Sequence, residues 1–183
     1  ERFIKEGRGK GSGKDYLHWI TVQDFPSNGR STRAPGWKTG RLHHFLSDHE
    51  KRLFYLFEWA DSIIDIREQF PLLDIDLAIT IAKDIGVKYP TEPSSKTPHI
   101  LTTDFMLTLN DNGREINITR TVKPSIELEK KRVAEKYELE RRYWVAKGID
   151  WGIITEKEIP RILADNIEWI HSAYILESTT ELS

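Results

Sequence analysis

The clearest pattern of hydrophobic and polar positions in the chain begins at Ser47. Glu50 stands three residues later, which is the spacing of a capping box at a helix start. Apolar side chains then recur at helical spacing and form one stripe: Leu53, Phe54, Phe57 and Ala60. The spacing predicts a helix from residue 47 to about residue 60.

The next segments alternate between strand and helix signals. The apolar run Ile63–Phe70 predicts a strand that ends at Pro71, because proline has no N–H to donate. Asp74 or Asp76 is placed to cap a short helix, and Gly86 is placed to close it. A helix is therefore inserted directly after the first strand.

Two further apolar runs read as a hairpin. Lys88–Pro98 contains three prolines and predicts a loop. The runs Ile100–Leu109 and Glu115–Lys123 then flank Asn112-Gly113, a dipeptide typical of tight two-residue turns. The pattern predicts two antiparallel strands joined at this turn.

The remaining elements complete an α/β order. The spacing predicts a helix from about Ile126 to Lys147, a short strand at Trp151–Ile154, and a helix from Thr155-x-x-Glu158 to Trp169. Apart from the inserted helix, the order αβββαβ resembles the core of the restriction-endonuclease-like fold. We therefore expect a mixed sheet flanked by helices.

The first 46 residues differ in composition from the rest. They are rich in Gly, Pro and Ser, with one strand-like piece at Trp19–Val22, and predict an extended arm or an irregular cover. Nine Lys/Arg against four Asp/Glu give this segment +5, whereas the whole chain carries −2. We expect a basic arm that contacts DNA through Arg8, Lys10, Lys14, Arg41 and His44. The alternative is a loop-rich segment whose charge has no binding role.

The hairpin turn fixes which residues face one another. If Asn112 and Gly113 are central, paired positions sum to 225, and Asp104 lies opposite Thr121. Lys123 is then the diagonal neighbour of Asp104 on the same face. A carboxylate on one strand and Lys at the end of the next resembles the signature of restriction-type nucleases. The alternative is a solvated strand face.

Glu50 extends the apolar stripe of its helix toward the sheet. A carboxylate there is costly unless it is paired or binds a metal. The alternative is that Glu50 only completes the capping box.

These residues together suit phosphodiester hydrolysis with Mg²⁺, for which Mn²⁺ is expected to substitute. Glu50, Asp104 and the backbone carbonyl of Val122 are the expected metal ligands, and Lys123 is expected to hold the attacking water. Thr121 is short and uncharged, so at that position the site loses a ligand or replaces it with water. The six histidines match no zinc spacing.

Composition limits the remaining classes. The chain has no Cys and no apolar run near the length of a membrane span, so we expect a soluble, cytoplasmic protein with no membrane partner. Its 183 residues suit one domain and part of a second. We expect a basic arm over 1–46, a catalytic domain over 47–158, and the start of a second region over 159–183.

Ordered blocks along the chain resemble the TnsA endonuclease subunits of heteromeric, cut-and-paste bacterial transposases. They are Ile4–Gly9, Gly13–Tyr16, Gly40–His44, Asp65–Leu72, Thr103–Phe105, Val122–Pro124 and Leu139–Trp144. The resemblance implies a restriction-type catalytic set at Glu50, Asp104 and Lys123, with Gln usual at the position of Thr121. It also implies a winged-helix region from about Ile159.

The resemblance further implies a bacterial, Mg²⁺-dependent endonuclease subunit that cuts the 5′ ends of a transposon. A DDE-type transposase subunit, TnsB, would cut and join the 3′ ends, and an ATPase regulator, TnsC, would activate both. Two alternatives stay open. One is a stand-alone restriction or repair nuclease, and the other is a scaffold that binds DNA or a partner and has a degenerate site at Thr121.

Overall fold

The structure is a computed structural model that describes residues 2–24 and 31–180, with the backbone only for residues 172 and 174–180. The elements are α1 (Arg2–Lys5), β1 (Thr32–Pro35), β2 (Leu42–Phe45), α2 (Asp48–Trp59), β3 (Ile63–Pro71), α3 (Ile75–Asp84), β4 (Thr102–Asp111), β5 (Arg114–Val122), α4 (Lys131–Ala146), β6 (Asp150–Ile154) and α5 (Arg161–Thr180). Short 3₁₀ turns occupy Gly13–Asp15 and Ser125–Glu129.

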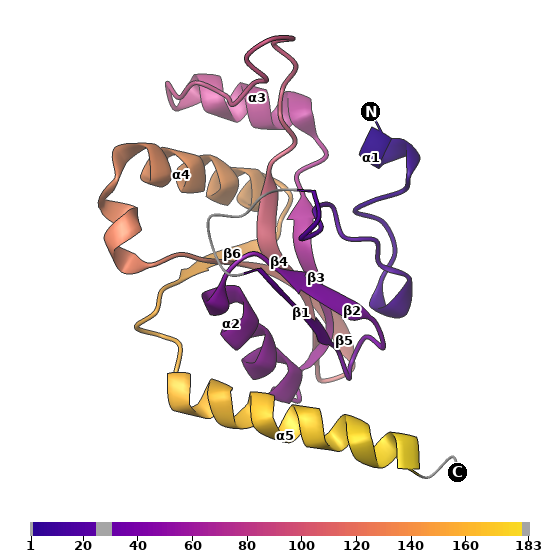
Figure 1. Cartoon of the computed structure of the whole chain (residues 1–183). Coiled ribbons are helices and arrows are strands. Elements are labelled where there is room, and N and C mark those ends of the chain that lie inside the picture. The colour runs from indigo at the N-terminus through magenta and orange to yellow at the C-terminus, as the bar shows by residue number, and fades with distance from the viewer. Residues whose placement is uncertain (1, 25–30, 181–183) are drawn as a thin grey trace.

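A four-stranded sheet in the order β3-β4-β5-β6 forms the centre of the molecule (Figure 1). β3, β4 and β5 pair antiparallel, and β6 pairs parallel to β5. A separate two-stranded sheet joins β1 and β2. The mixed α/β sheet and the αβββαβ order, with α3 inserted, confirm the predicted restriction-endonuclease-like class.

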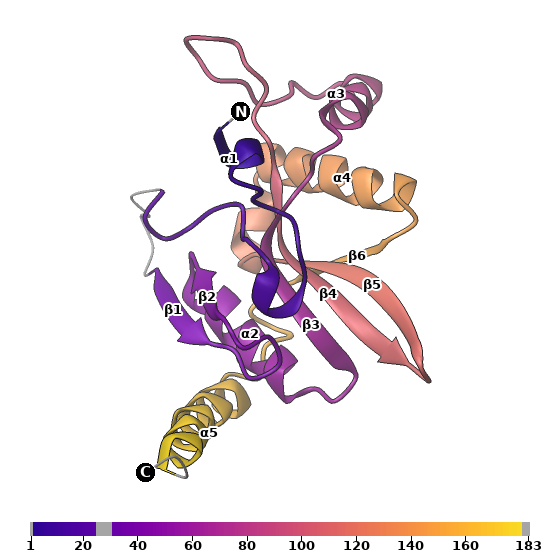
Figure 2. The same ribbon diagram turned by 90° about the vertical axis from the view of Figure 1, so that its right-hand side faces the viewer.

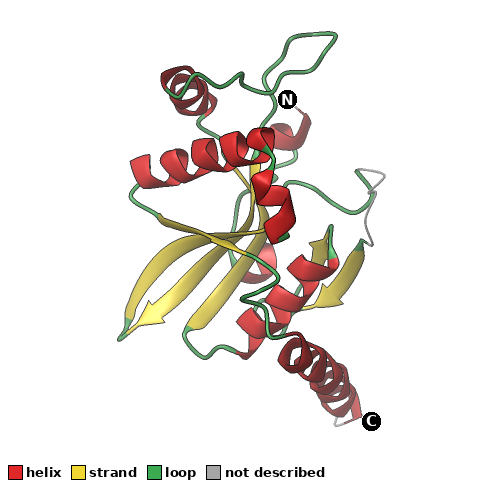
Figure 3. Cartoon of the chain, turned by 90° about the vertical axis from the view of Figure 1, so that its left-hand side faces the viewer, coloured by secondary structure: helices red, strands yellow, loops and turns green. Residues whose placement is uncertain are grey.

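Helices cover both faces of the sheet, as Figure 3 shows. On one face α2 buries its stripe against β3 and β4, with Phe54, Ile66 and Phe105 fully buried. On the other face α3 and α4 pack together, and Leu139, Tyr143 and Trp144 of α4 lie in a second buried cluster. Residues on the sheet therefore face one of two cores.

Local signals in the sequence placed several boundaries correctly. Ser47 caps α2 by accepting from the N–H of Glu50, and Asp74 caps α3 by accepting from the N–H of Leu77. The hairpin turns at Asn112-Gly113 and pairs Asp111 with Arg114, so the predicted register is confirmed from the turn as far as Phe105 and Arg120. Each of these features depends on residues close together in the chain.

Two predicted helix starts were wrong. The helix expected from Ile126 is interrupted, because Lys130 is extended between the 3₁₀ turn and α4, and Ser125 is bonded to Glu156 instead of continuing a helix. Thr155 and Glu158 do form the expected capping bond, in which the Thr155 N–H donates to the Glu158 carboxylate at 2.7 Å. The residues between them form a turn and not the start of a helix. α5 begins after Pro160, which suits a helix start because it needs no N–H there.

The N-terminal segment covers the body and does not extend from it (Figure 2). Trp19 is buried, and the strand predicted at Trp19–Val22 is absent from this described stretch. Gly9 packs so closely that an added Cβ would meet Pro71 at 2.4 Å, which only glycine avoids. Residues 1 and 25–30 of the predicted basic arm lie outside the described residues.

α5 occupies the region expected to open a winged-helix domain, and it packs along α2. Lys51 pairs with Glu168 at 2.9 Å, and Arg52 pairs with Asp165 at 3.3 Å. The winged-helix region stays a prediction. Within the described residues, no helix combines the length and apolar composition needed to cross a membrane.

Candidate active site

Glu50 lies on the first turn of α2, where its carboxylate is buried and well supplied with donors. Oε2 accepts from the Leu46 N–H at 3.0 Å and from Gln69 Nε2 at 3.1 Å, and Oε1 accepts from the Ser47 hydroxyl at 2.9 Å. Burial nevertheless raises the pKa of Glu50, and these bonds and Lys123 only oppose that rise. Glu50 is thus both a capping residue and a carboxylate aimed at the sheet.

Asp104 lies near the start of β4, and its Oδ2 accepts the backbone N–H of Val122 at 2.8 Å. Burial, and then the charges of Glu50 and Glu140, raise the pKa of Asp104 to about 8. The Val122 N–H and Lys136 act in the opposite direction. Asp104 therefore sits in a field of like charges that favours binding a cation or a proton.

The predicted facing of Asp104 and Thr121 was wrong. The strand pairs sum to 225 only as far as Phe105 and Arg120, and it is the hydroxyl of Thr103 that lies 3.1 Å from that of Thr121. The regular β4–β5 pairing ends beside Gln69 of β3, whose φ is +50°, although β3 keeps one register with β4 on either side of Gln69. Strand alternation predicts facing residues only while the pairing is regular.

Thr121 is bonded to a residue that the sequence reasoning missed. Glu140 of α4 is 1% exposed, and its Oε1 accepts from the hydroxyls of Thr103 and Thr121 and from Trp151 Nε1 at 3.0 Å. One carboxylate oxygen thus joins α4 to β4, β5 and β6. Its position could have been found from its spacing, because Glu140 falls between Tyr137 and Trp144 on the buried stripe of α4.

Gln69 is the second residue that the sequence did not indicate. It is 2% exposed, and its amide donates to Glu50 while its Oε1 faces the Thr102 hydroxyl at 3.4 Å. Positive φ is uncommon for a residue with a side chain, and such residues concentrate at functional sites. Nothing in the local sequence predicts this conformation, because it depends on the pairing of β3 with β4.

Lys123 follows the last residue of β5, and its backbone N–H donates to the Ile154 carbonyl of β6 at 3.0 Å. Its charge lowers the pKa of Glu50. The charge of Glu50 in turn raises the pKa of Asp104, and the catalytic role of the three residues stays a prediction.

The donor set fits a hard divalent cation. Glu50 and Asp104 supply anionic oxygens, and their mutual repulsion would be relieved by a positive ion. Among the described residues no group of three or more His, Asp or Glu side chains is arranged to hold a metal. A cation would thus need the Val122 backbone carbonyl or water beside the two carboxylates. The Thr121 hydroxyl is engaged with Glu140.

The expected DNA-contacting residues differ in how free they are. Arg8 bonds to Asp24 at 2.7 Å and to the Trp19 carbonyl, and Arg41 donates to the buried Glu68 at 2.8 Å. Burial, and then His18, lower the pKa of His44 to about 4. These side chains serve the fold, whereas Lys10 and Lys14 are exposed. DNA contact by any of the five stays a prediction.

Residues 60–156 match the family model described as "TnsA-like endonuclease N terminal", a range that contains Asp104, Thr121, Lys123 and Glu140 but not Glu50. The chain is also 48% identical over 181 residues to "Transposon Tn7 transposition protein TnsA" of Escherichia coli. The aligned part is 99% of this chain and 65% of that protein, so the chain spans about two thirds of that relative.

Proposed function

Since the chain belongs to the family of TnsA-like endonucleases, we propose that it is a Mg²⁺-dependent DNA endonuclease subunit that cuts the 5′ ends of a transposon. One observation supports this most strongly. Two carboxylates, Glu50 and Asp104, repel one another in a buried site. The positive charge of Lys123 lowers the pKa of Glu50. That arrangement suits a cation and a phosphate better than an empty structural site.

Glu50, Asp104 and the Val122 carbonyl would hold the cation, and Mn²⁺ is expected to replace Mg²⁺. When bound, the ion would supply charge neutralisation at the phosphate and a more acidic water. The N–H of Val122 orients the Asp104 carboxylate, and the Gln69 amide orients that of Glu50.

Lys123 performs the positioning step. Its backbone is fixed by β6, and its ammonium can hold the attacking water beside the scissile phosphorus, leaving 5′-phosphate and 3′-hydroxyl ends. Thr121 has no place in the ligand set of this proposal, because its hydroxyl donates to Glu140. Its role is to anchor the strand beside the site.

The partners follow from the family and are proposals for this chain. The E. coli relative is named as a transposition protein of the transposon Tn7. We infer that this chain acts in the bacterial cytoplasm on transposon-end DNA together with a DDE-type transposase subunit, TnsB, and an ATPase regulator, TnsC. A net charge of −2 gives little basic surface, so the isolated chain should cut poorly.

The test reconstitutes nicking of transposon-end DNA with the partner subunits in Mg²⁺. Lys123→Ala should reduce the rate of nicking about 10²-fold, the usual loss when one transition-state donor is removed. Lys157→Ala, which removes an exposed lysine near the end of β6, is the matched control and should cut at the wild-type rate. Equal cutting by both variants would remove Lys123 from the mechanism.

A further inference from the structure

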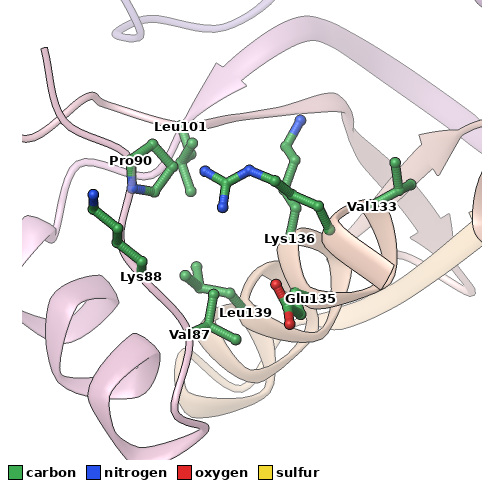
Figure 4. A pocket seen from close by; sticks show the side chains of 9 residues that line it. Val87, Lys88, Pro90, Leu101, Val133, Glu135, Lys136 and Leu139 are labelled. Atoms are coloured by element: carbon green, nitrogen blue, oxygen red, sulfur yellow. The ribbon is translucent and has the colours of Figure 1, made fainter. Parts of the chain in front are cut away.

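A hollow of about 200 Å³ lies between α4 and the loop that follows α3. Its floor is apolar, with Val87 and Leu139 on one side and Leu101 opposite (Figure 4). Lys88 stands on the loop side and Lys136 on the α4 side, and Arg132 also lines it. We call these six residues the basic groove.

The groove continues into a second, wider hollow. The two share Lys88 and Arg132, and the second adds Lys96 and His99. Cations from a loop and from a helix therefore line one continuous surface of the molecule.

The three cations of the basic groove are exposed, and Lys136 also lies over the ring of its neighbour Tyr137 at 5.5 Å. Within the described residues no carboxylate lies within 4 Å of the charged groups of Lys88, Arg132 or Lys136, whereas Arg41, Lys51 and Arg52 elsewhere are all in ion pairs. Glu135, which also lines the hollow, is paired with Lys131 at 3.8 Å. In a chain of net negative charge, cations that gather on one surface without carboxylate partners indicate an anionic ligand.

The basic groove adjoins the candidate active site through α4. Lys136 precedes the buried Tyr137 by one residue and Glu140 by about one turn. Its charge lowers the pKa of Asp104, so the lysine is close enough to act on the catalytic carboxylate. Arg132 lies one turn before Lys136, toward the N-terminus of α4 and away from Glu140. A chain of anions leaving the site along α4 would meet these side chains in succession.

We propose that the basic groove binds the DNA backbone flanking the scissile bond, with Lys136, Arg132 and Lys88 contacting phosphates and the apolar floor receiving the deoxyribose edge. This inference rests on the proposed endonuclease function. It moves the main DNA contact from the N-terminal segment, where Arg8 and Arg41 are held by carboxylates, to the opening between α4 and the loop.

Spacing and chemistry favour DNA over an acidic partner protein. Side chains four residues apart on a helix have Cβ atoms about 5–6 Å apart, so Arg132 and Lys136 can each reach a different phosphate of one strand. Long, flexible cations give contact without base specificity, as phosphate binding requires. The groove also adjoins the site where the scissile phosphate would sit, which gives a bound strand continuity with the reaction.

Binding of the full chain to a fluorescent transposon-end duplex, measured by anisotropy in EDTA at several salt concentrations, tests the proposal without cleavage. The variant Lys88→Ala/Arg132→Ala/Lys136→Ala should bind at least 10-fold more weakly at low salt. The slope of log affinity against log salt should fall by about 2.7, since each phosphate contact contributes about 0.9. The control Lys83→Ala/Lys157→Ala/Arg114→Ala also removes two lysines and one arginine, from exposed positions outside the groove, and should keep the wild-type slope.

A third variant, Lys10→Ala/Lys14→Ala, tests the rival surface. If the slope of log affinity against log salt falls in this variant but stays at the wild-type value in the groove variant, the proposal is overturned. Unchanged DNA binding by the groove variant, together with lost nicking in the full reaction, would also overturn it and assign the groove to a partner protein.

The nicking assay separates this proposal from the proposed function. One outcome is that the wild type fails to nick with its partners while the groove variant shows the reduced slope of log affinity against log salt. In that case DNA binding by the basic groove is supported and the endonuclease function is contradicted. If the wild type nicks and the groove variant keeps both slope and affinity, only the groove proposal fails. Thermal unfolding of each variant confirms that the exposed substitutions leave the fold intact.

Discussion

The backbone N–H of Val122 donates a hydrogen bond of 2.8 Å to Oδ2 of Asp104. In a regular hairpin of this register, Val122 would lie opposite Thr103 and bond to its backbone. The regular pairs stop at Phe105 and Arg120, so the side chain of Asp104 takes the place of a backbone acceptor. The carboxylate is thereby held at the end of the hairpin, next to the charge of Glu50.

The first prediction concerns Asp104→Asn in metal-free protein. Burial and Glu50 raise the pKa of Asp104 to about 8, from about 3.9 in an unfolded chain. Between these values the folded state binds the extra proton, so the free energy of unfolding falls as the pH rises from about 4 to 8. Asn stays neutral and still offers an oxygen to Val122. At pH 8.5 we expect it to be more stable than wild type by about 2 kcal/mol, a fraction of the full linkage because solvent screens a partly exposed group.

Urea unfolding in EDTA at pH 5 and pH 8.5 measures this difference. At pH 5 the folded carboxyl is still protonated and only about the first quarter of this fall has occurred, so the gap between the two proteins should be much smaller than at pH 8.5. Asp61→Asn, at an exposed position, controls for the loss of one carboxylate. A gap between Asp104→Asn and wild type that is the same at both pH values would contradict the raised pKa.

The second prediction concerns metal affinity. A divalent cation must displace the proton on Asp104, so the apparent Kd for Mg²⁺ or Mn²⁺ should fall about tenfold per pH unit up to pH 8 and then level off. Calorimetry in two buffers of different ionisation enthalpy would show close to one proton released per metal below pH 8. An affinity that does not change between pH 6 and pH 8 would argue against Asp104 as a ligand.

The third prediction concerns the threonine of the site. Thr121→Val removes one of the three donors to Glu140 and leaves that buried carboxylate less satisfied. We expect a loss of about 1–3 kcal/mol in the free energy of unfolding, measured in urea. Thr119→Val is the matched control, because Thr119 is also buried in β5 but donates to the Asp150 carbonyl. If Thr119→Val proves at least as damaging, Glu140 is not dependent on Thr121.

The fourth prediction separates structure from DNA contact at Arg41. Its guanidinium donates to both carboxylate oxygens of Glu68, which is 0% exposed. Although burial opposes ionisation, His43 and Arg41 hold the pKa of Glu68 well below its usual range. Arg41→Ala removes this partner from the buried Glu68 carboxylate and should lower the free energy of unfolding by about 3–5 kcal/mol.

Lys14→Ala, at an exposed lysine of the same N-terminal segment, should change stability by less than about 0.5 kcal/mol. Adding Glu68→Gln to Arg41→Ala should recover part of the loss, because the stranded charge is removed. If Arg41→Ala unfolds like wild type in urea but binds DNA weakly, the arginine belongs to the DNA interface after all.

Local chemistry made much of this fold predictable. The turn at Asn112-Gly113 sets the hairpin register, and the caps at Ser47 and Asp74 set two helix starts, because each interaction spans only a few residues. The same reasoning failed at Thr155, where a cap pair formed but Pro160 determined the start of the helix. A capping signal specifies a turn, and the following residues decide whether a helix continues from it.

The site was predictable only in part. Glu50, Asp104 and Lys123 were predicted from periodicity, register and family resemblance, and their catalytic roles stay predictions. The spacing of α4 marks Glu140 as buried but does not identify its bonding partners, which lie on the sheet. The positive φ of Gln69 arises where β3 meets β4, and no local pattern encodes it. The facing of Thr121 was predicted wrongly because the regular β4–β5 pairing stops at Phe105 and Arg120, and strand alternation holds only while the pairing is regular.

The oxygen of Glu140 that joins one helix to three strands limits how this protein can be engineered. A library that varies β5 in search of a different metal preference would also select for proteins that still fold. Gain of a new ligand at position 121 therefore calls for a simultaneous change in α4, because a single substitution there also removes a donor to Glu140 and lowers the stability of the fold.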